Sequence, residues 1–392
     1  MTNVASFDQW IRGEFRALNT ELEELYFAAK DLGAVETTGQ AQKERLVEAG
    51  RQHIVQLLAE GNTDEGFENA FDLLGNVGLY MGACRRHEIT NPDRERVSPL
   101  TEASALAMHI GASLGVAPRF ATSHLATHNP AVDGEYKSFT SLEAEFVFLE
   151  YNTRGVLAYK RAADALVRRL PLGISHPVAY ELLRTAKDAL EDVVESNELL
   201  FDKLDTDRFF YCVRPYYKPY RVGQQVYRGA NAGDFAGINA IDLLLGLCRA
   251  DNPSYSQMLV DKFLFMMPED QNMLRDVMRR QSLLDDLLER VDECAGSEWF
   301  QKNARMFIEV CDAHGRTAVS HHNALVGKFI ERPADELPPE RMQNLTASGP
   351  PLKILMDALE KLRDLRLAAD RDDIPTRYKD LTRLRVAVGL PT

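Results

Sequence analysis

The sequence predicts an all-α fold, and three observations carry this prediction. Apolar residues recur at helical spacing along most of the 392-residue chain. Alternating β-branched runs bounded by turn residues, the usual sign of strands, do not stand out. Hydrophobic residues make up 45% and charged residues 27% of the chain, which favours a globular protein over long disorder. We therefore expect a helical bundle with a small N-terminal helical domain (1–130) and a larger helical domain (131–392).

The individual helices follow from apolar periodicity and from breakers. Residues 7–31 repeat large apolar side chains such as Trp10, Phe15 and Leu22 near helical spacing. Pro99 suits the first turn of a helix, and the stretch 170–173 separates two long helices. The predicted helices are 7–31, 99–115, 141–170, 176–203, 234–249, 254–266, 268–291, 298–329 and 350–369. In the run 73–88, three glycines would let a helix approach a neighbour closely: Gly75, Gly78 and Gly82.

Charge and cysteine content exclude several functions. The chain has 46 Lys and Arg against 59 Asp and Glu, a net charge of −13, so nucleic acid is not an expected partner. Five cysteines without a CxxC pair are typical of a reducing compartment. Neither a signal peptide nor a run of roughly 18 apolar residues is visible, so we expect a cytoplasmic protein without a membrane partner. The oligomeric state stays open, with a homodimer as one alternative.

Two stretches interrupt the helical pattern. Residues 125–140 contain Asn-Pro and Asp-Gly turn signals, and residues 214–233 combine prolines, glycines, tyrosines and arginines. Long loops in helical proteins are often functional. We place the domain boundary near the first stretch and a functional site near the second.

The second stretch suits the recognition of a carboxylate. Arg214 and Arg221 flank aromatic residues, and a planar guanidinium binds a substrate carboxylate or a haem propionate well. Several tyrosines could line the same pocket: Tyr216, Tyr217, Tyr220 and Tyr227. A solvated surface loop with exposed arginines explains the composition equally well.

Three histidines lie on the predicted helix 298–329. His314 and His321 are seven residues apart and share a face, whereas His322 lies about 100° further round. A zinc site made from all three is therefore unfavourable, but one histidine could bind haem iron. By spacing alone, a packed or exposed histidine is the more common outcome. The loop 346–351 is similarly ambiguous, because it fits both a simple helix start and a lid over a pocket.

Several separated motifs resemble one enzyme family. They are VGLYMGACRRHE (77–88), HNPAVDGEYKSFTSLEAE (128–145), GVLAYKRAADAL (155–166), FYCVRPYYKPYRVGQQVYRGANAGDFAGINAIDLLLG (210–246) and HNALVGKFI (322–330) followed by Ser348-Gly349. In order and spacing, they are similar to the monodechloroaminopyrrolnitrin synthase family of the indoleamine/tryptophan 2,3-dioxygenase superfamily. The resemblance covers roughly residues 70–370 and implies the helical fold of those haem enzymes, with haem b bound by the larger domain.

The resemblance also implies roles for individual residues. His322 matches the proximal histidine, which binds the iron, and Arg214 matches the arginine that holds the substrate carboxylate in relatives. Asp242 matches an aspartate on the proximal side and is a candidate to tune the imidazole by hydrogen bonding. Ser348 and Gly349 match the small-residue loop near the substrate and the haem edge. The remaining candidates for the substrate pocket are Tyr216, Phe139 and Phe146.

This sequence departs from the family's relatives at one informative position. Relatives carry an arginine three residues before the proximal histidine, where it contacts a haem propionate, but this chain has Val319 there. Arg316 or His321 could take its place.

The resemblance therefore implies a haem-dependent oxidative enzyme. Its substrate would be tryptophan or a related indole or aromatic amino acid, its oxidant O2 or a peroxide, and its reaction a ring rearrangement or an oxygenation. A haem-binding sensor or carrier without turnover is the alternative, and a helical scaffold that has lost haem is a third. A haem band in the visible spectrum, and a tryptophan-induced shift of that band that is lost in Arg214→Ala, would separate them.

Overall fold

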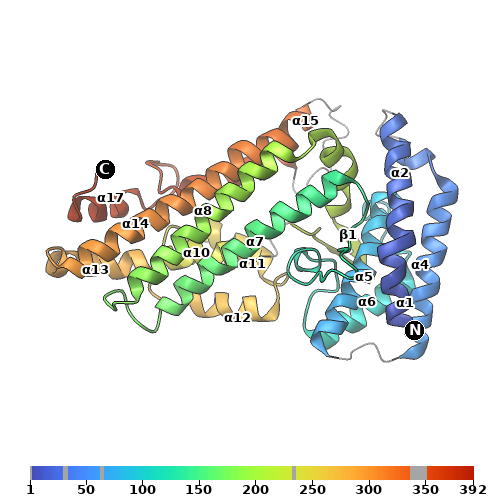
Figure 1. Ribbon diagram of the computed structural model, residues 1–392, viewed down its shortest axis with the longest axis horizontal. Coiled ribbons are helices and arrows are strands. Elements are labelled where there is room, and N and C mark those ends of the chain that lie inside the picture. Colours follow the sequence, from blue (N-terminus) through green and yellow to red (C-terminus); the bar gives the residue numbers. More distant parts are fainter. Residues whose placement is uncertain (1, 30–33, 62–65, 232–234, 336–350) are drawn as a thin grey trace. The chain divides into compact units, whose positions relative to one another are not determined.

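The structure, a computed structural model, describes residues 2–29, 34–61, 66–231, 235–335 and 351–392. Within these ranges helices predominate and the only sheet is a two-stranded antiparallel one, which confirms the all-α prediction (Figure 1). The chain forms two compact units. Unit 1 comprises Met1–Glu150, Lys203–Asp234 and Phe329–Leu352, and unit 2 comprises Tyr151–Asp202, Phe235–Lys328 and Lys353–Thr392. Because each unit combines separate stretches, the units do not test the predicted boundary at residue 130.

Unit 1 is built around helices α4, α5 and α6, which pack against one another. Its elements are α1 (Asn3–Trp10), η1 (Ile11–Phe15), α2 (Arg16–Ala29), α3 (Ala34–Thr37), α4 (Gln40–Glu60), α5 (Phe67–Arg86), α6 (Thr101–Leu114), η2 (Thr122–His124), the start of α7 (Glu143–Arg169), α9 (Thr206–Arg208), η3 (Phe209–Val213), η4 (Arg214–Tyr217), β1 (Tyr220–Val222), β2 (Gln225–Tyr227) and α15 (Arg332–Asp335). Its core is rich in buried aromatic side chains, including Phe7, Phe15, Tyr80 and Phe120.

The glycines of α5 allow the close approach that the sequence predicts. A Cβ atom on Gly78 would lie 2.7 Å from Cβ of Phe120, too close for any other residue type without movement. The neighbour is the irregular segment after α6 and not another helix.

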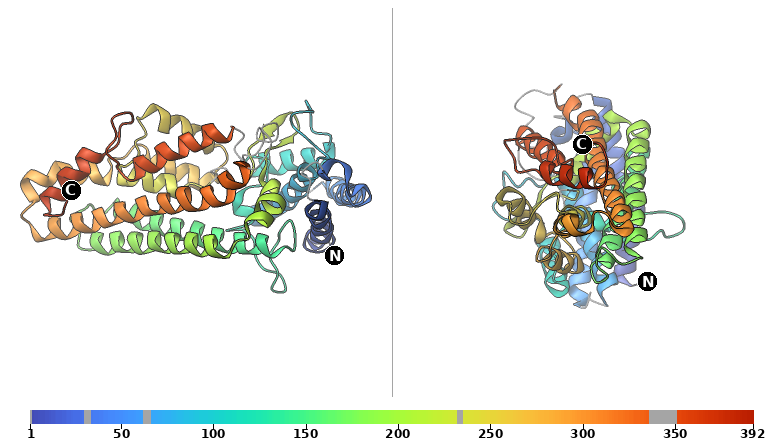
Figure 2. Two further views of the ribbon diagram at one scale, coloured as in Figure 1. Left: turned by 90° about the horizontal axis from the view of Figure 1, so that it is seen from above. Right: turned by 90° about the vertical axis from the view of Figure 1, so that its left-hand side faces the viewer.

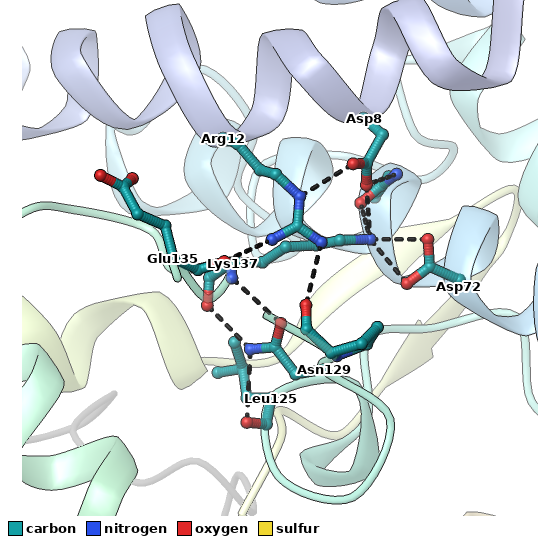
Figure 3. Close-up of polar contacts among 9 residues, drawn as sticks. Asp8, Arg12, Asp72, Leu125, Asn129, Glu135 and Lys137 are labelled. Carbon is teal, nitrogen blue, oxygen red and sulfur yellow. Dashed lines mark hydrogen bonds and ion pairs between the residues drawn. The ribbon is translucent and has the colours of Figure 1, made fainter. Parts of the chain in front are cut away.

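A buried lysine fastens the irregular segment 125–140 to the helices of unit 1 (Figure 3). The Lys137 ammonium lies 2.7 Å from a carboxylate oxygen of Asp8 and 2.6 Å from one of Asp72. Asn129 bonds the Lys137 backbone in both directions, at 2.9 and 3.0 Å, and Arg12 donates to the Glu135 carbonyl. Since a buried charge is costly without partners, this network holds the segment in one conformation.

Unit 2 is a bundle in which α7, α8 and α14 run alongside one another (Figures 1 and 2). Besides α7, its elements are α8 (Ala179–Lys203), α10 (Gly237–Leu245), α11 (Pro253–Phe263), α12 (Pro268–Val277), α13 (Leu283–Cys294), α14 (Glu298–Val319), η5 (Ser320–Glu331), α16 (Leu352–Arg366) and α17 (Tyr378–Ala387). Their apolar faces form one continuous core. None of the helices in the described ranges is long and apolar enough to cross a membrane.

Two local predictions are wrong. The single helix predicted over 268–291 is divided into α12 and α13, because the Ser282 hydroxyl accepts a hydrogen bond from the Asp285 amide at 3.2 Å and caps the second helix. The stretch 214–233, expected to be a loop, contains the β1–β2 hairpin. Gly223 has a φ of +57° at the first position of its two-residue turn, which a glycine adopts readily.

Candidate functional site

The three histidines lie on one continuous helical segment whose winding changes before His321. Helix α14 passes directly into η5, a π-helix of 12 residues that carries His321 and His322. A π-helix is wider than an α-helix, is rarely so long, and often occurs at a functional site. The change in winding sets His322 apart from His314, which lies on the regular α-helical part.

His322 has the environment expected of a metal ligand. Its side chain is 7% exposed, and its Nδ1 atom is enclosed without a hydrogen-bond partner among the described residues. The ring of His321, itself exposed, stands at 89° to that of His322, with 5.2 Å between their centroids. Burial lowers the pKa of His322 to about 2, so the imidazole is neutral at physiological pH. Only a neutral imidazole can bind a metal, and a ring nitrogen without a partner is compatible with that role. Nδ1 of His314 is also enclosed without a partner in the described ranges, so it is the position of His322 on the π-helical segment that distinguishes the two.

Asp242 is the centre of a buried polar cluster in unit 2. Arg366 donates two hydrogen bonds to its carboxylate, both 2.8 Å long, and the Tyr255 hydroxyl donates a third of 2.8 Å. Nε2 of His314 lies 2.7 Å from Oδ1 of the same carboxylate. Burial raises the pKa of Asp242, but the Arg366 charge and the bonds from His314 and Arg366 outweigh it, so the pKa lies well below 3.8. Asp242 is therefore charged and fully satisfied.

The hydrogen bonds of this cluster reach His314 and not His322. The pKa of His314 is lowered by burial, despite the opposing effect of Asp242, so this imidazole is also neutral. The positive charge of Arg366, which Asp242 holds by hydrogen bonds, contributes to lowering the pKa of His322. The sequence analysis does not identify Arg366 or Tyr255 as site residues. The burial of Arg366 is predictable, because it follows the buried Leu362 by four residues and so lies on the same face of the helix.

The two substitutes considered for the missing arginine at Val319 differ in position. Arg316 pairs with Glu191 of α8 at 3.2 Å and is half exposed. His321 lies directly beside His322. A third cation, Arg363 of α16, lies near His322 although it is about 40 residues away in the sequence. It donates a hydrogen bond of 3.1 Å to the side chain of Asn323, the residue after His322. Arg363 is thus a further candidate to contact a propionate.

Arg214 lies in unit 1, directly after the π-helical turn η3 and at the start of the 3₁₀-helix η4. Its guanidinium stacks over the Phe210 ring, 5.4 Å from the centroid. Burial lowers the pKa of Arg214 to about 10, and the side chain is only partly exposed. A partly desolvated guanidinium binds a carboxylate more strongly than one in open water.

The aromatic residues predicted for the substrate pocket differ in exposure. Phe139 and Tyr216 are buried and stack on each other, with 4.4 Å between ring centroids. The Tyr216 hydroxyl lies 3.5 Å from Nε2 of His87. Phe146 is partly exposed. Tyr216 and Phe139 therefore form part of the unit 1 core, and Phe146 is the most accessible of the three.

Ser348 and Gly349 lie outside the described residues. His322, Asp242 and Arg316 belong to unit 2, whereas Arg214, Tyr216, Phe139 and Phe146 belong to unit 1.

The family model for monodechloroaminopyrrolnitrin synthase PrnB matches residues 1–388.

Proposed function

Because the chain belongs to the monodechloroaminopyrrolnitrin synthase family, a family of oxidative enzymes of pyrrolnitrin biosynthesis, we propose that it is a haem b-dependent enzyme acting on tryptophan or a related indole amino acid. The reaction would be a ring rearrangement or an oxygenation, with O2 or a peroxide as the oxidant. The observation that carries the proposal is His322: a neutral, buried imidazole with an unused nitrogen on a π-helical segment.

In this proposal, His322 holds the haem iron, and the bound haem supplies the redox chemistry. The Arg366 guanidinium, held by Asp242, keeps a positive charge near His322 and so makes the imidazole a weaker electron donor. Arg316 or Arg363 would neutralise a propionate, or His321, whose imidazole is neutral because its pKa is lowered to about 4, would donate a hydrogen bond to it.

Arg214 would bind the substrate carboxylate and so fix the orientation of the aromatic ring. Much of the protein's contribution to catalysis would then be positioning, which converts a bimolecular encounter into an oriented complex. Phe146 would contact the ring, and Ser348 and Gly349 would complete the pocket.

Turnover is the direct test. The haem-loaded protein is incubated with L-tryptophan or a chlorinated tryptophan and either O2 with a reductant or hydrogen peroxide, and consumption is followed by liquid chromatography and mass spectrometry. We expect haem-dependent loss of at least one of these substrates. Haem binding without consumption of any of them would favour a sensor or carrier, and no haem binding would overturn the proposal.

The role of Arg214 has its own test. L-tryptophan should shift the haem absorption band of the wild-type protein, and Arg214→Gln should weaken that binding about tenfold or more, as expected for loss of a hydrogen-bonded charge pair. Tryptamine, which lacks the carboxylate, should bind both proteins equally. Equal weakening for both ligands would contradict the carboxylate role.

A further inference from the structure

Lys218 is a partly buried cation that the sequence does not single out. It directly follows η4, the helix that begins with Arg214, and its backbone is extended there. Among the residues that the structure describes, none forms an ion pair or a hydrogen bond with its ammonium. A partly buried charge without a partner is uncommon, because desolvation has to be offset by an opposite charge or a ligand.

The charges around Lys218 are mostly positive. Arg85 lies beside it, since its Nε donates to the carbonyl of Pro219 at 3.3 Å. Arg85, Arg86 and Arg214 repel the Lys218 charge, and Glu88 attracts it. The end of α5 and helix η4 thus bring several cations together.

The carboxylates at this position are already engaged. Glu88 accepts hydrogen bonds from Arg85 and from Arg94, both at 2.7 Å. Glu23 is bound by Arg86 through two bonds of 2.7 Å. Both carboxylates are thus paired with arginines, and Glu88 offsets the Lys218 charge only in part.

The backbone that carries Lys218 is firmly held. A Cβ atom on Gly229 would lie 1.6 Å from the carbonyl oxygen of Tyr217, so the chain after β2 presses directly against the peptide between Tyr217 and Lys218. The hydroxyl of Tyr220, two residues further on, accepts a hydrogen bond from the Phe120 amide at 2.6 Å. Lys218 therefore does not reach a distant partner by moving its backbone.

We propose that Lys218 is the second cation of the anion site that begins with Arg214, and that both bind the carboxylate of the amino-acid ligand. The proposal rests on the proposed function, because that function supplies the carboxylate. A carboxylate has two oxygens and can accept from a guanidinium and an ammonium together. Its negative charge would relieve the repulsion among Arg85, Arg214 and Lys218.

The proposal predicts that protons are taken up when the ligand binds. Burial, together with the charges of Arg85, Arg86 and Arg214 and against that of Glu88, lowers the pKa of Lys218 to about 7. At pH 8 the free amine is therefore mostly neutral. A bound carboxylate favours the charged form and raises the pKa, so Lys218 gains a proton on binding. At pH 6 it is already charged, and little uptake should occur.

Calorimetry of L-tryptophan binding to the haem-loaded protein, in two buffers of different ionisation enthalpy, measures this uptake. At pH 8 the wild-type protein should take up close to one proton per ligand, whereas at pH 6 the uptake should be near zero. Lys218→Met should bind about tenfold more weakly at pH 6 and show no uptake. Lys218→Arg should keep most of the affinity but lose the uptake at pH 8, because arginine stays charged. Lys379→Met, which removes an exposed lysine, should behave as the wild type.

Unchanged affinity in Lys218→Met, or uptake that persists in Lys218→Arg, would overturn the proposal. Absence of tryptophan binding to the wild-type protein would instead overturn the proposed function.

In that case, the anion site is tested separately by acetic anhydride labelling at pH 7.5, with the modified lysines identified by mass spectrometry. Lys218 should react faster than Lys379, and indole-3-propionate and acetate should protect it whereas tryptamine should not. Reactivity equal to that of Lys379, without protection by either anion, would reject the site.

Discussion

The polar cluster around Asp242 has a buried negative charge at its centre, whereas the cluster around Lys218 consists mainly of positive charges. In unit 2, the buried Asp242 carboxylate is matched by Arg366 and by neutral donors, so its charge is fully compensated. In unit 1, Lys218 faces other cations, and the nearby carboxylates are already bound. The first arrangement suits a fixed electrostatic environment for His322. The second has an excess of positive charge among the described residues, which suits the capture of an anionic ligand.

Loss of the Asp242 charge should have the largest effect on stability. Asp242→Asn leaves Arg366 buried without its counter-charge, and breaking a buried pair in this way costs about 3–5 kcal/mol in the free energy of unfolding. Urea denaturation measures this loss. Arg316→Gln, which breaks the half-exposed pair with Glu191, should cost less than about 1 kcal/mol. Similar losses for the two variants would contradict the view that the Asp242 cluster is a closed structural unit.

An intermediate loss of stability is expected when the backbone contact between Gly229 and Tyr217, next to Lys218, is disturbed. Gly229→Ala forces the chain away from the carbonyl of Tyr217 and should reduce stability by about 1–3 kcal/mol, a usual cost of overpacking. It should also weaken tryptophan binding, because Lys218 and Arg214 are displaced. Gly155→Ala is the matched control, since a Cβ atom there meets nothing within 4 Å. Tryptophan affinity that survives Gly229→Ala would show that this contact does not position the site.

The smallest effect is a dependence of stability on pH from buried neutral histidines in unit 1. Burial lowers the pKa of His87 and of His124 well below 6.5, the value expected in the unfolded chain. Their contribution is complete above pH 6.5 and is lost as the pH falls, because the unfolded chain then binds protons that the folded chain does not. Each histidine adds a slope of up to about 1.4 kcal/mol per pH unit.

Urea denaturation of the haem-free protein at pH 7.5 and 5.5 measures this slope. Stability should be lower at pH 5.5, and His87→Gln should reduce the difference. An equal free energy of unfolding at the two pH values would mean that these imidazoles become charged without cost.

Much of the fold could be predicted from the sequence, because burial of one helix face leaves a regular apolar repeat. The helices predicted over 99–115, 141–170 and 176–203 correspond closely to α6, α7 and α8. The π-helical winding of η5 could not be predicted, since its residues follow the same apolar pattern as an α-helix. The β1–β2 hairpin is too short to show a clear alternation, although Gly223 marks its turn.

The candidate site was predictable only where a motif carries it. His322, Arg214 and Asp242 follow from the resemblance to the family. Arg366 meets Asp242 across 124 residues of sequence, and no local pattern encodes that contact. Lys218 is a candidate because of the charges at the end of α5, which lie far from it in the sequence.

The central claim is that His322 binds haem iron, and His322→Ala tests it most directly. The wild-type protein, titrated with haem, should give a Soret band and the spectrum of a histidine-ligated haem. His322→Ala should lose that spectrum and regain it when imidazole is added, whereas His321→Ala should retain it without imidazole. A His322→Ala protein with an unchanged spectrum, or a loss in His321→Ala instead, would contradict the account.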